Sequence, residues 1–128
     1  MDHTTLPPTA GEAYPVFLPV VDADGIPEGG IEAPFVRAPL GTYFGWNLRK
    51  AGFGEGELCS LTGSFVPFPK QAAADDSRAP LSERYEDSDA YLAAVKAAAD
   101  NLVAEGLMLP DDVDFVMERA RAEASVLN

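Results

Sequence analysis

The sequence predicts an α+β fold, with an irregular, hairpin-containing N-terminal half followed by a C-terminal helical hairpin. Most of the 11 Gly and 11 Pro precede residue 70, whereas alanines are concentrated after it. Apolar residues recur at spacings of three and four only beyond residue 87, which indicates helices there. These changes divide the 128 residues into an extended arm (1–11), a Pro/Gly-rich β and loop region (12–69), a linker (70–80) and a helical region (81–128).

Short strands are expected in the N-terminal half. Residues 14–21 form a β-favouring run that ends in an Asp-Ala-Asp-Gly sequence, and Asp-Gly is a strong signal for a hairpin turn. This run contains two prolines, which cannot donate to a ladder, so the strand is predicted at a sheet edge or a bulge. Further extended segments are predicted at residues 35–38, 42–48 and 64–68.

Helices are predicted after Pro80. Residues 81–85 are expected to form a single turn, and Asp87 or Ser88 to cap a helix that runs to about residue 105, with Gly106 as its stop. A second helix is expected to contain Pro110 in its first turn. The first helix is predicted to bury Tyr91, Leu92, Val95, Ala98, Ala99, Leu102 and Val103, and the second Val113, Val116, Met117 and Ala120.

Composition excludes several classes of function. The chain carries 9 Lys and Arg against 21 Asp and Glu, a formal net charge of -12, so nucleic acid and anionic membranes are not expected as partners. One cysteine and one histidine cannot supply an internal disulfide or a zinc site of the usual kind, and no cofactor is expected. The first residues lack the basic-then-apolar pattern of a secretory signal, so a cytoplasmic location is favoured.

No catalytic constellation is found in the sequence. His3 is the only imidazole, and its place in the predicted arm favours a solvent-exposed residue over a general base. Ser60 and Ser64 lack the G-x-S-x-G elbow of a serine hydrolase. Acidic residues surround Cys59, which disfavours its thiolate, and this cysteine is expected to be a small core residue.

Paired carboxylates in the predicted hairpin turn suggest calcium, because Asp22-x-Asp24-Gly25 matches part of an EF-hand loop. Aligning the glycine with that of the loop puts Val20 and Ile31 where two of the ligands should stand. The sequence therefore favours a turn over a metal site.

Residues 39–49 hold the only Trp, two other aromatic residues, an amide and an arginine. In a pocket, Tyr43 and Trp46 would supply apolar walls and Asn47 and Arg49 hydrogen-bond donors. The same side chains serve equally well as packing in a loop-rich domain, and both interpretations remain open. The candidate pocket or interface residues are Tyr43, Trp46, Asn47, Arg49, Ser64 and Phe65.

Residues 12 to about 122 resemble a known family. Segment 38–49 reads Ala-Pro-Leu-Gly-Thr-Tyr-Phe-Gly-Trp-Asn-Leu-Arg and segment 61–68 reads Leu-Thr-Gly-Ser-Phe-Val-Pro-Phe. Together with segments 14–25, 81–85 and 97–112, in this order, they look like the C-terminal region of bacterial alpha/beta hydrolase domain-containing proteins. The resemblance implies hydrolysis of ester-type bonds by a full-length relative, in which the serine elbow and the triad histidine lie upstream of this region. No position of this chain matches those two elements.

Three functions follow as hypotheses. The chain is a non-catalytic C-terminal portion or separate subunit of a serine hydrolase, which packs on a catalytic domain. Alternatively, it is a free-standing acidic module for protein interaction or small-ligand binding, or a small enzyme that uses carboxylates or arginine. For an incomplete domain, the surroundings of Phe17, Phe35, Trp46 and Phe65 are expected to be exposed or buried in an oligomer interface.

Overall fold

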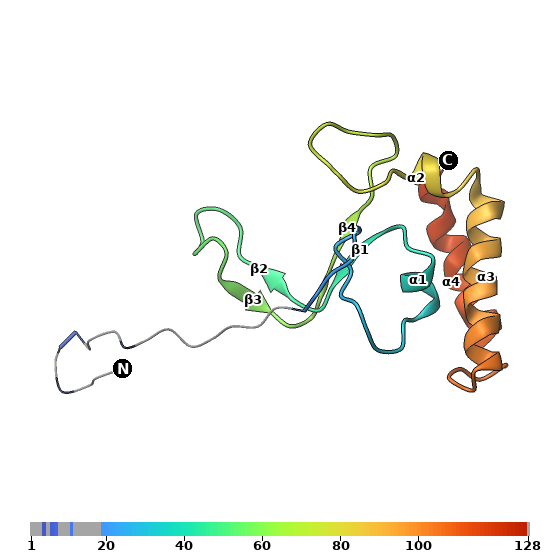
Figure 1. Ribbon diagram of the computed structural model, residues 1–128, viewed down its shortest axis with the longest axis horizontal. Coiled ribbons are helices and arrows are strands. Elements are labelled where there is room, and N and C mark those ends of the chain that lie inside the picture. Colours follow the sequence, from blue (N-terminus) through green and yellow to red (C-terminus); the bar gives the residue numbers. More distant parts are fainter. Residues whose placement is uncertain (1–3, 5, 8–10, 12–18, 128) are drawn as a thin grey trace.

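The computed structural model describes residues 4, 6–7, 11 and 19–127, and it confirms the α+β class. Helices α1 (Pro34–Arg37), α3 (Ser88–Ala104) and α4 (Asp112–Glu123) lie side by side at one end of the molecule (Figure 1). The short helix α2 (Leu81–Arg84) precedes α3, and a 3-10 turn, η1 (Ala124–Leu127), follows α4. The predicted arm, strand 14–21 and Phe17 lie mostly or wholly outside the described residues.

Helix α3 begins and ends where the sequence predicts. The Asp87 carboxylate accepts a hydrogen bond from the Ala90 amide at 2.8 Å, and Gly106 adopts a φ of 73° just beyond the last turn. The Leu107 amide then bonds back to the Leu102 carbonyl at 2.9 Å, which closes the helix end. The predicted apolar face is the buried one: Tyr91, Val95, Ala98, Ala99 and Leu102 are buried, whereas Leu92 and Val103, also predicted on this face, are half-buried.

The core of the molecule lies between α3, α4 and the start of β1 (Gly41–Phe44). Met117 and Ala120 of α4 are buried against α3, as the helical spacing predicts. The core cluster comprises Ala38, Leu40, Phe68, Leu81, Tyr91, Val95, Met117, Ala120 and Ala124. Among the described residues no helix is long and apolar enough to cross a bilayer.

Four strands form one long, interrupted hairpin. Strand β1 pairs antiparallel with β4 (Ser64–Pro67), so that Tyr43 faces Phe65 across the ladder. The inner pair, β2 (Asn47–Leu48) and β3 (Leu58–Ser60), has an irregular register at Asn47/Leu48. The β2–β3 segment, which we call the hairpin arm (residues 47–60), extends away from the helices (Figure 1).

Two local predictions are wrong. Residues 35–38 are predicted to be extended, but Pro34 opens the helical turn α1, and Phe35 packs against the core from it. Proline at the first helical position has its φ preset for a helix and loses no intrahelical donor, which explains the turn. Cys59 is predicted to be buried, but it lies exposed in β3, a strand that the sequence does not predict.

The Asp22–Gly25 segment is a turn, as predicted. An antiparallel bridge joins Val21 and Pro27, and one carboxylate oxygen of Asp22 accepts from the Asp24 and Ile26 amides at 2.9 Å each. The Asp24 carboxylate forms an ion pair with Arg84. Within the described residues no group of three or more metal-ligating side chains is found.

Two arginines connect α2 and the segment before it to the rest of the fold: Arg78 bonds to the sheet, and Arg84, the last residue of α2, bonds to the Asp22–Gly25 turn. Arg78 donates to the Thr42 hydroxyl at 2.9 Å and to the Val66 and Pro67 carbonyls at 3.0 and 3.1 Å. Its guanidinium also pairs with Asp76 at 2.6 Å. Arg84 pairs with Asp24, and both guanidinium groups lie over the ring of Phe68, at 5.2 and 4.0 Å. We call these residues the arginine cluster (Arg78, Arg84, Asp24, Asp76).

This cluster predicts an acid-sensitive contribution to stability. Hydrogen bonds from the side chain and the backbone amide of Arg78 lower the pKa of Asp76 from 3.8 to about 2. Because the pKa is lower in the folded state, Asp76 stabilises the fold above about pH 4, and this contribution is lost as the pH falls towards 2. The urea midpoint of Asp76→Asn is therefore expected to fall less than that of the wild type between pH 6 and pH 3.

A matched substitution of the exposed neighbour Asp75→Asn controls for the change in net charge. Identical pH dependence of wild type and Asp76→Asn would show that the Arg78–Asp76 pair does not stabilise the folded state.

Candidate functional site

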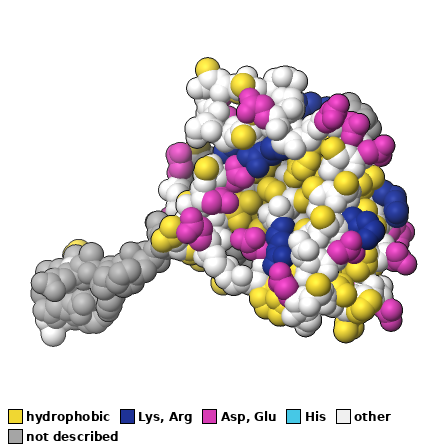
Figure 2. Space-filling view, turned by 45° about the vertical axis from the view of Figure 1, so that its right-hand side comes forward, with side chains coloured by type: hydrophobic (Ala, Val, Ile, Leu, Met, Phe, Trp, Pro, Cys, Tyr) yellow, Lys and Arg dark blue, Asp and Glu magenta, His cyan; other side chains and the backbone are white. Residues whose placement is uncertain are grey.

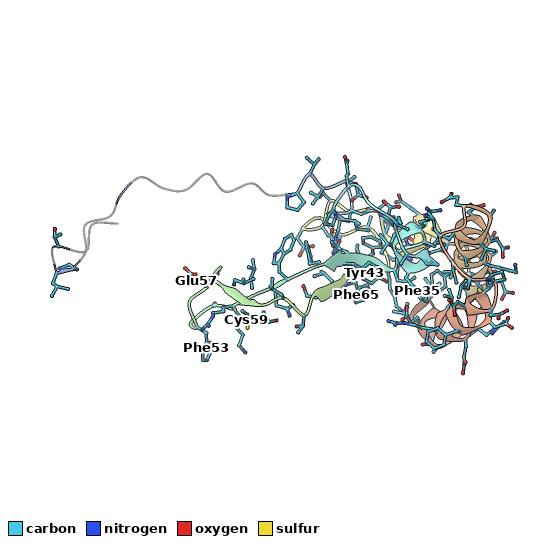
Figure 3. All side chains as sticks on the ribbon, turned by 90° about the horizontal axis from the view of Figure 1, so that it is seen from below. Phe35, Tyr43, Phe53, Glu57, Cys59 and Phe65 are labelled. Atoms are coloured by element: carbon cyan, nitrogen blue, oxygen red, sulfur yellow. The ribbon has the colours of Figure 1, made fainter. Side chains whose placement is uncertain are left out.

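A groove lies between the β1–β4 ladder and α4. Alternation along a strand puts Tyr43, Phe65 and Pro67 on the same face of the ladder, and this face turns towards the helices. The two aromatic rings contact each other, with centroids 5.0 Å apart, as Figure 3 shows for neighbouring strands. The groove has a volume of about 380 Å³ and is lined by Leu40, Tyr43, Phe65, Pro67, Arg119, Glu123 and Val126.

The two charged side chains that line the groove, Arg119 and Glu123, neutralise each other. Arg119 and Glu123, one turn apart on α4, form an ion pair at 2.8 Å, and the guanidinium also lies 5.2 Å from the centre of the Phe35 ring. Burial, followed by the negative charge of Glu123, raises the pKa of Tyr43 above its ordinary value. The Tyr43 side chain therefore presents a neutral hydroxyl.

A second tyrosine lies in the core and does not line the groove. Tyr91 of α3 is fully buried, and its ring packs edge-on against Tyr85 at 5.3 Å. Its hydroxyl finds no hydrogen-bond partner among the residues that the structure describes. Burial raises the pKa of Tyr91, and so do the nearby groups of Glu123 and Tyr43, which both line the groove. A buried hydroxyl without a partner costs about 1–3 kcal/mol.

The opposite face of the ladder carries a different set of side chains. The rings of Phe44 and Trp46 contact each other at a centroid distance of 5.8 Å with planes tilted by 52°, and the Ser64 hydroxyl donates to the Trp46 carbonyl at 3.0 Å. A shallow hollow on this side is lined by Phe44, Trp46, Leu48, Ser64 and Val66, which we call the outer face. Trp46 is half-buried, whereas Leu48 is 58% exposed.

The hairpin arm presents further apolar side chains. Asn47 donates to the Ser60 and Thr62 hydroxyls at 2.9 and 3.1 Å, which ties β2 to β3. Phe53 and Cys59 lie towards the end of the arm, far from Tyr43 and Phe65 (Figure 3). A shallow surface on the arm is lined by Leu48, Arg49, Lys50, Phe53 and Cys59.

The six candidate residues therefore lie in three places. Tyr43 and Phe65 line the groove, Trp46 and Ser64 belong to the outer face, and Arg49 and Asn47 belong to the arm. The sequence analysis missed Arg119 and Glu123 as groove residues, because an Arg-x-x-x-Glu spacing on a helix is typical of an ordinary surface ion pair. Among the aromatic residues expected to be exposed or buried in an oligomer interface, Phe65 is 48% exposed, and Phe35 and Trp46 are half-buried.

Comparison with known proteins decides the family. A family model described as an alpha/beta hydrolase domain matches residues 2–118. The chain belongs to this alpha/beta hydrolase family. No curated protein and no solved structure matches it.

Ser60 and Ser64 of this hydrolase-family chain are engaged in structural hydrogen bonds. The Ser60 hydroxyl bonds to Asn47 and Thr62, and that of Ser64 to the Trp46 backbone, so both hold the turn between β3 and β4. The only histidine in the sequence, His3, lies outside the described residues. The hydrogen-bond partners of the Ser60 and Ser64 hydroxyls are an amide, a hydroxyl and a backbone carbonyl, and none of these groups is a general base that could activate a nucleophile.

Proposed function

We propose that this chain is the non-catalytic C-terminal portion, or a separate subunit, of an alpha/beta serine hydrolase that acts on ester-type substrates. In this role it packs on a catalytic domain that supplies the serine and the histidine. Membership of the alpha/beta hydrolase family supports the hydrolase assignment. The outer face and the hairpin arm support the packing role.

The outer face is the single observation that carries the packing role. Phe44 and Trp46 lie beside Leu48 and Val66, which are 58% and 42% exposed, so apolar side chains form a continuous patch on one side of a two-stranded ladder. Contiguous exposed apolar patches of this kind mark contact surfaces, whereas scattered single residues do not.

The hairpin arm also supports a packing role. A two-stranded hairpin is only marginally stable in water by itself. In this arm Leu48, Phe53 and Leu58 are exposed, so their burial against a partner would stabilise both the strand pair and the complex. On the face shown in Figure 2, acidic and basic side chains are interspersed between the exposed apolar ones.

Size-exclusion chromatography with light scattering tests this role. The chain is co-expressed with a catalytic domain of the same family that carries a G-x-S-x-G elbow and is encoded beside it. A one-to-one complex is expected, and Leu48→Ser is expected to weaken the complex at least about tenfold by removing apolar contact area. Leu109→Ser in the loop between α3 and α4 removes an equally apolar exposed side chain and is expected to leave the complex intact.

Activity of the isolated chain distinguishes the alternatives. No turnover of 4-nitrophenyl esters is expected from the chain alone. Turnover that disappears when one of its own carboxylates is replaced would show a small enzyme instead. A monomer that forms no complex and binds no hydrophobic dye would favour the free-standing module.

A further inference from the structure

We infer that the hairpin arm docks on a surface of the catalytic domain that combines carboxylates with apolar side chains. This inference rests on the proposed packing role and adds the chemistry of the partner surface that the arm meets. It is carried by one side of the arm, where two cations without a carboxylate partner adjoin exposed apolar side chains.

This side of the arm is apolar and open to solvent. It is lined by Leu48, Arg49, Lys50, Phe53 and Cys59, which we call the basic side of the arm. Leu48 is 58% and Phe53 67% exposed, because the arm extends away from the helices (Figures 1 and 3). Leu48 also lines the outer face, so a partner that covers the outer face comes next to the basic side.

The two cations of the basic side have no carboxylate partner in the described part of the chain. The ion pairs found there involve Arg37, Arg78, Arg84, Lys96 and Arg119. Arg49 and Lys50 are both exposed. The Lys50 ammonium lies 5.8 Å from the centre of the Phe53 ring, so a positive charge adjoins the largest apolar side chain of the basic side.

The carboxylates of the arm do not neutralise the basic side. Glu55 and Glu57 are exposed, neither lines the basic side, and neither forms an ion pair with its cations. Figure 3 shows Glu57 on the other side of the arm from Phe53 and Cys59. The arm holds two cations and two carboxylates, so the net charge of -12 belongs entirely to the rest of the chain.

Burial of the basic side in an interface requires two kinds of group on the partner. A cation that leaves water without a counter-charge is costly, so Arg49 and Lys50 need carboxylates opposite them. Leu48 and Phe53 need apolar contacts, which a bare phosphate backbone does not offer. An acidic protein surface with apolar side chains provides both.

The protruding arm also allows an acidic partner to bind to an acidic chain. Helix α4 carries Asp111, Asp112 and Asp114 at its beginning and lies at the other end of the molecule from the arm (Figure 1). Exposed charges separated by more than ~8 Å are largely screened at physiological ionic strength. The carboxylates of the helical end therefore repel a partner bound at the arm only weakly.

Charge reversal in the complex tests the role of the cations. The dissociation constant between the whole chain and the catalytic domain encoded beside it is measured calorimetrically in about 50 and about 500 mM NaCl. Arg49→Glu/Lys50→Glu is expected to weaken the complex at least about tenfold at the lower salt concentration and clearly less at the higher, because salt screens the charge pairs. Lys96→Glu/Arg121→Glu makes the same change in net charge on α3 and α4 and is expected to leave the affinity within about threefold of wild type.

Substitution of one phenylalanine tests the apolar part of the partner surface. Phe53→Ser is expected to weaken the complex at least about tenfold at both salt concentrations, because it removes apolar contact area. Phe115→Ser removes a phenylalanine that is 69% exposed on α4, and it is expected to leave the complex intact.

Cross-linking identifies the groups opposite the arm. A carbodiimide joins an amine directly to a carboxylate, and it is expected to link Lys50 to an Asp or Glu of the catalytic domain, which mass spectrometry of the digested complex detects. Lys50→Arg keeps the positive charge but has no reactive amine, so binding is expected to remain while this cross-link disappears.

The possible failures are distinguishable. A complex that Leu48→Ser weakens, but that neither the charge reversal nor Phe53→Ser affects, contradicts the acidic docking surface and leaves the packing role intact. Absence of any complex with the wild-type chain contradicts the packing role itself. Sedimentation of the wild-type chain, but not of Phe53→Ser, with vesicles of phosphatidylcholine and phosphatidylglycerol would assign the arm to an anionic membrane and overturn the inference.

Discussion

Replacement of Arg78 by alanine is expected to lower the free energy of unfolding by about 2–4 kcal/mol. The guanidinium serves three acceptors on the sheet, namely the Thr42 hydroxyl and the Val66 and Pro67 carbonyls, and pairs with Asp76. Its side chain is 17% exposed, so water replaces these bonds only in part. Thr42, which is 1% exposed, would keep only its bond to the Asp24 carbonyl.

Urea denaturation followed by circular dichroism measures this effect. Arg78→Lys keeps the positive charge but cannot present a planar fork to several acceptors, so we expect an intermediate loss. Arg121→Ala, an exposed arginine of α4, controls for the loss of one positive charge from an acidic chain. A change below about 0.5 kcal/mol in Arg78→Ala would show that the arginine cluster does not hold the segment before α2 to the sheet.

Gly41→Ala is expected to destabilise the protein by about 3 kcal/mol, because the β1–β4 ladder leaves no space for a methyl group. A Cβ atom at this position would lie 2.5 Å from the Val66 carbonyl oxygen, 2.6 Å from the Phe65 ring and 2.7 Å from the Pro67 Cα. Two of these atoms belong to the backbone of the paired strand, so the strands themselves must separate.

Gly45→Ala provides the matched control, because nothing lies within 4 Å of a Cβ atom placed there. Thermal unfolding of the two variants should differ clearly, with Gly45→Ala close to wild type. Equal stabilities of the two variants would contradict the register of Gly41 opposite Pro67.

The two ends of α3 could be predicted from the sequence because they depend on residues close to each end. Asp87 caps α3 with its own side chain, and Gly106 ends the helix by adopting a positive φ, so both signals act within one turn of the residue. The buried face of α3 follows from the spacing of its apolar residues for the same reason. The turn at Asp22–Gly25 belongs with these features.

The pairing of the strands and the exposure of individual side chains depend on contacts between residues that are far apart in the sequence. Cys59 is expected in the core because its sequence neighbours do not favour a reactive thiolate, yet it is exposed because the hairpin arm leaves the body of the molecule. Phe35 is predicted in a strand but lies in the short helix α1. From this helix its side chain packs against the core, a contact that the neighbouring residues in the sequence do not reveal. The arginine cluster joins residues up to 60 positions apart, so no local sequence pattern predicts it.

The sequence by itself determined the α+β class, the helical hairpin, the caps of α3, the acidic net charge and the resemblance to alpha/beta hydrolases, whereas α4 begins at Asp112, two residues after the predicted Pro110. Only the tertiary structure decided that Tyr43 and Phe65 meet Arg119 and Glu123 in one groove while Trp46 faces the other way. The physical reason is that capping and periodicity act between near neighbours, whereas a groove is made by a ladder register and a helix docking that bring together residues about 80 positions apart.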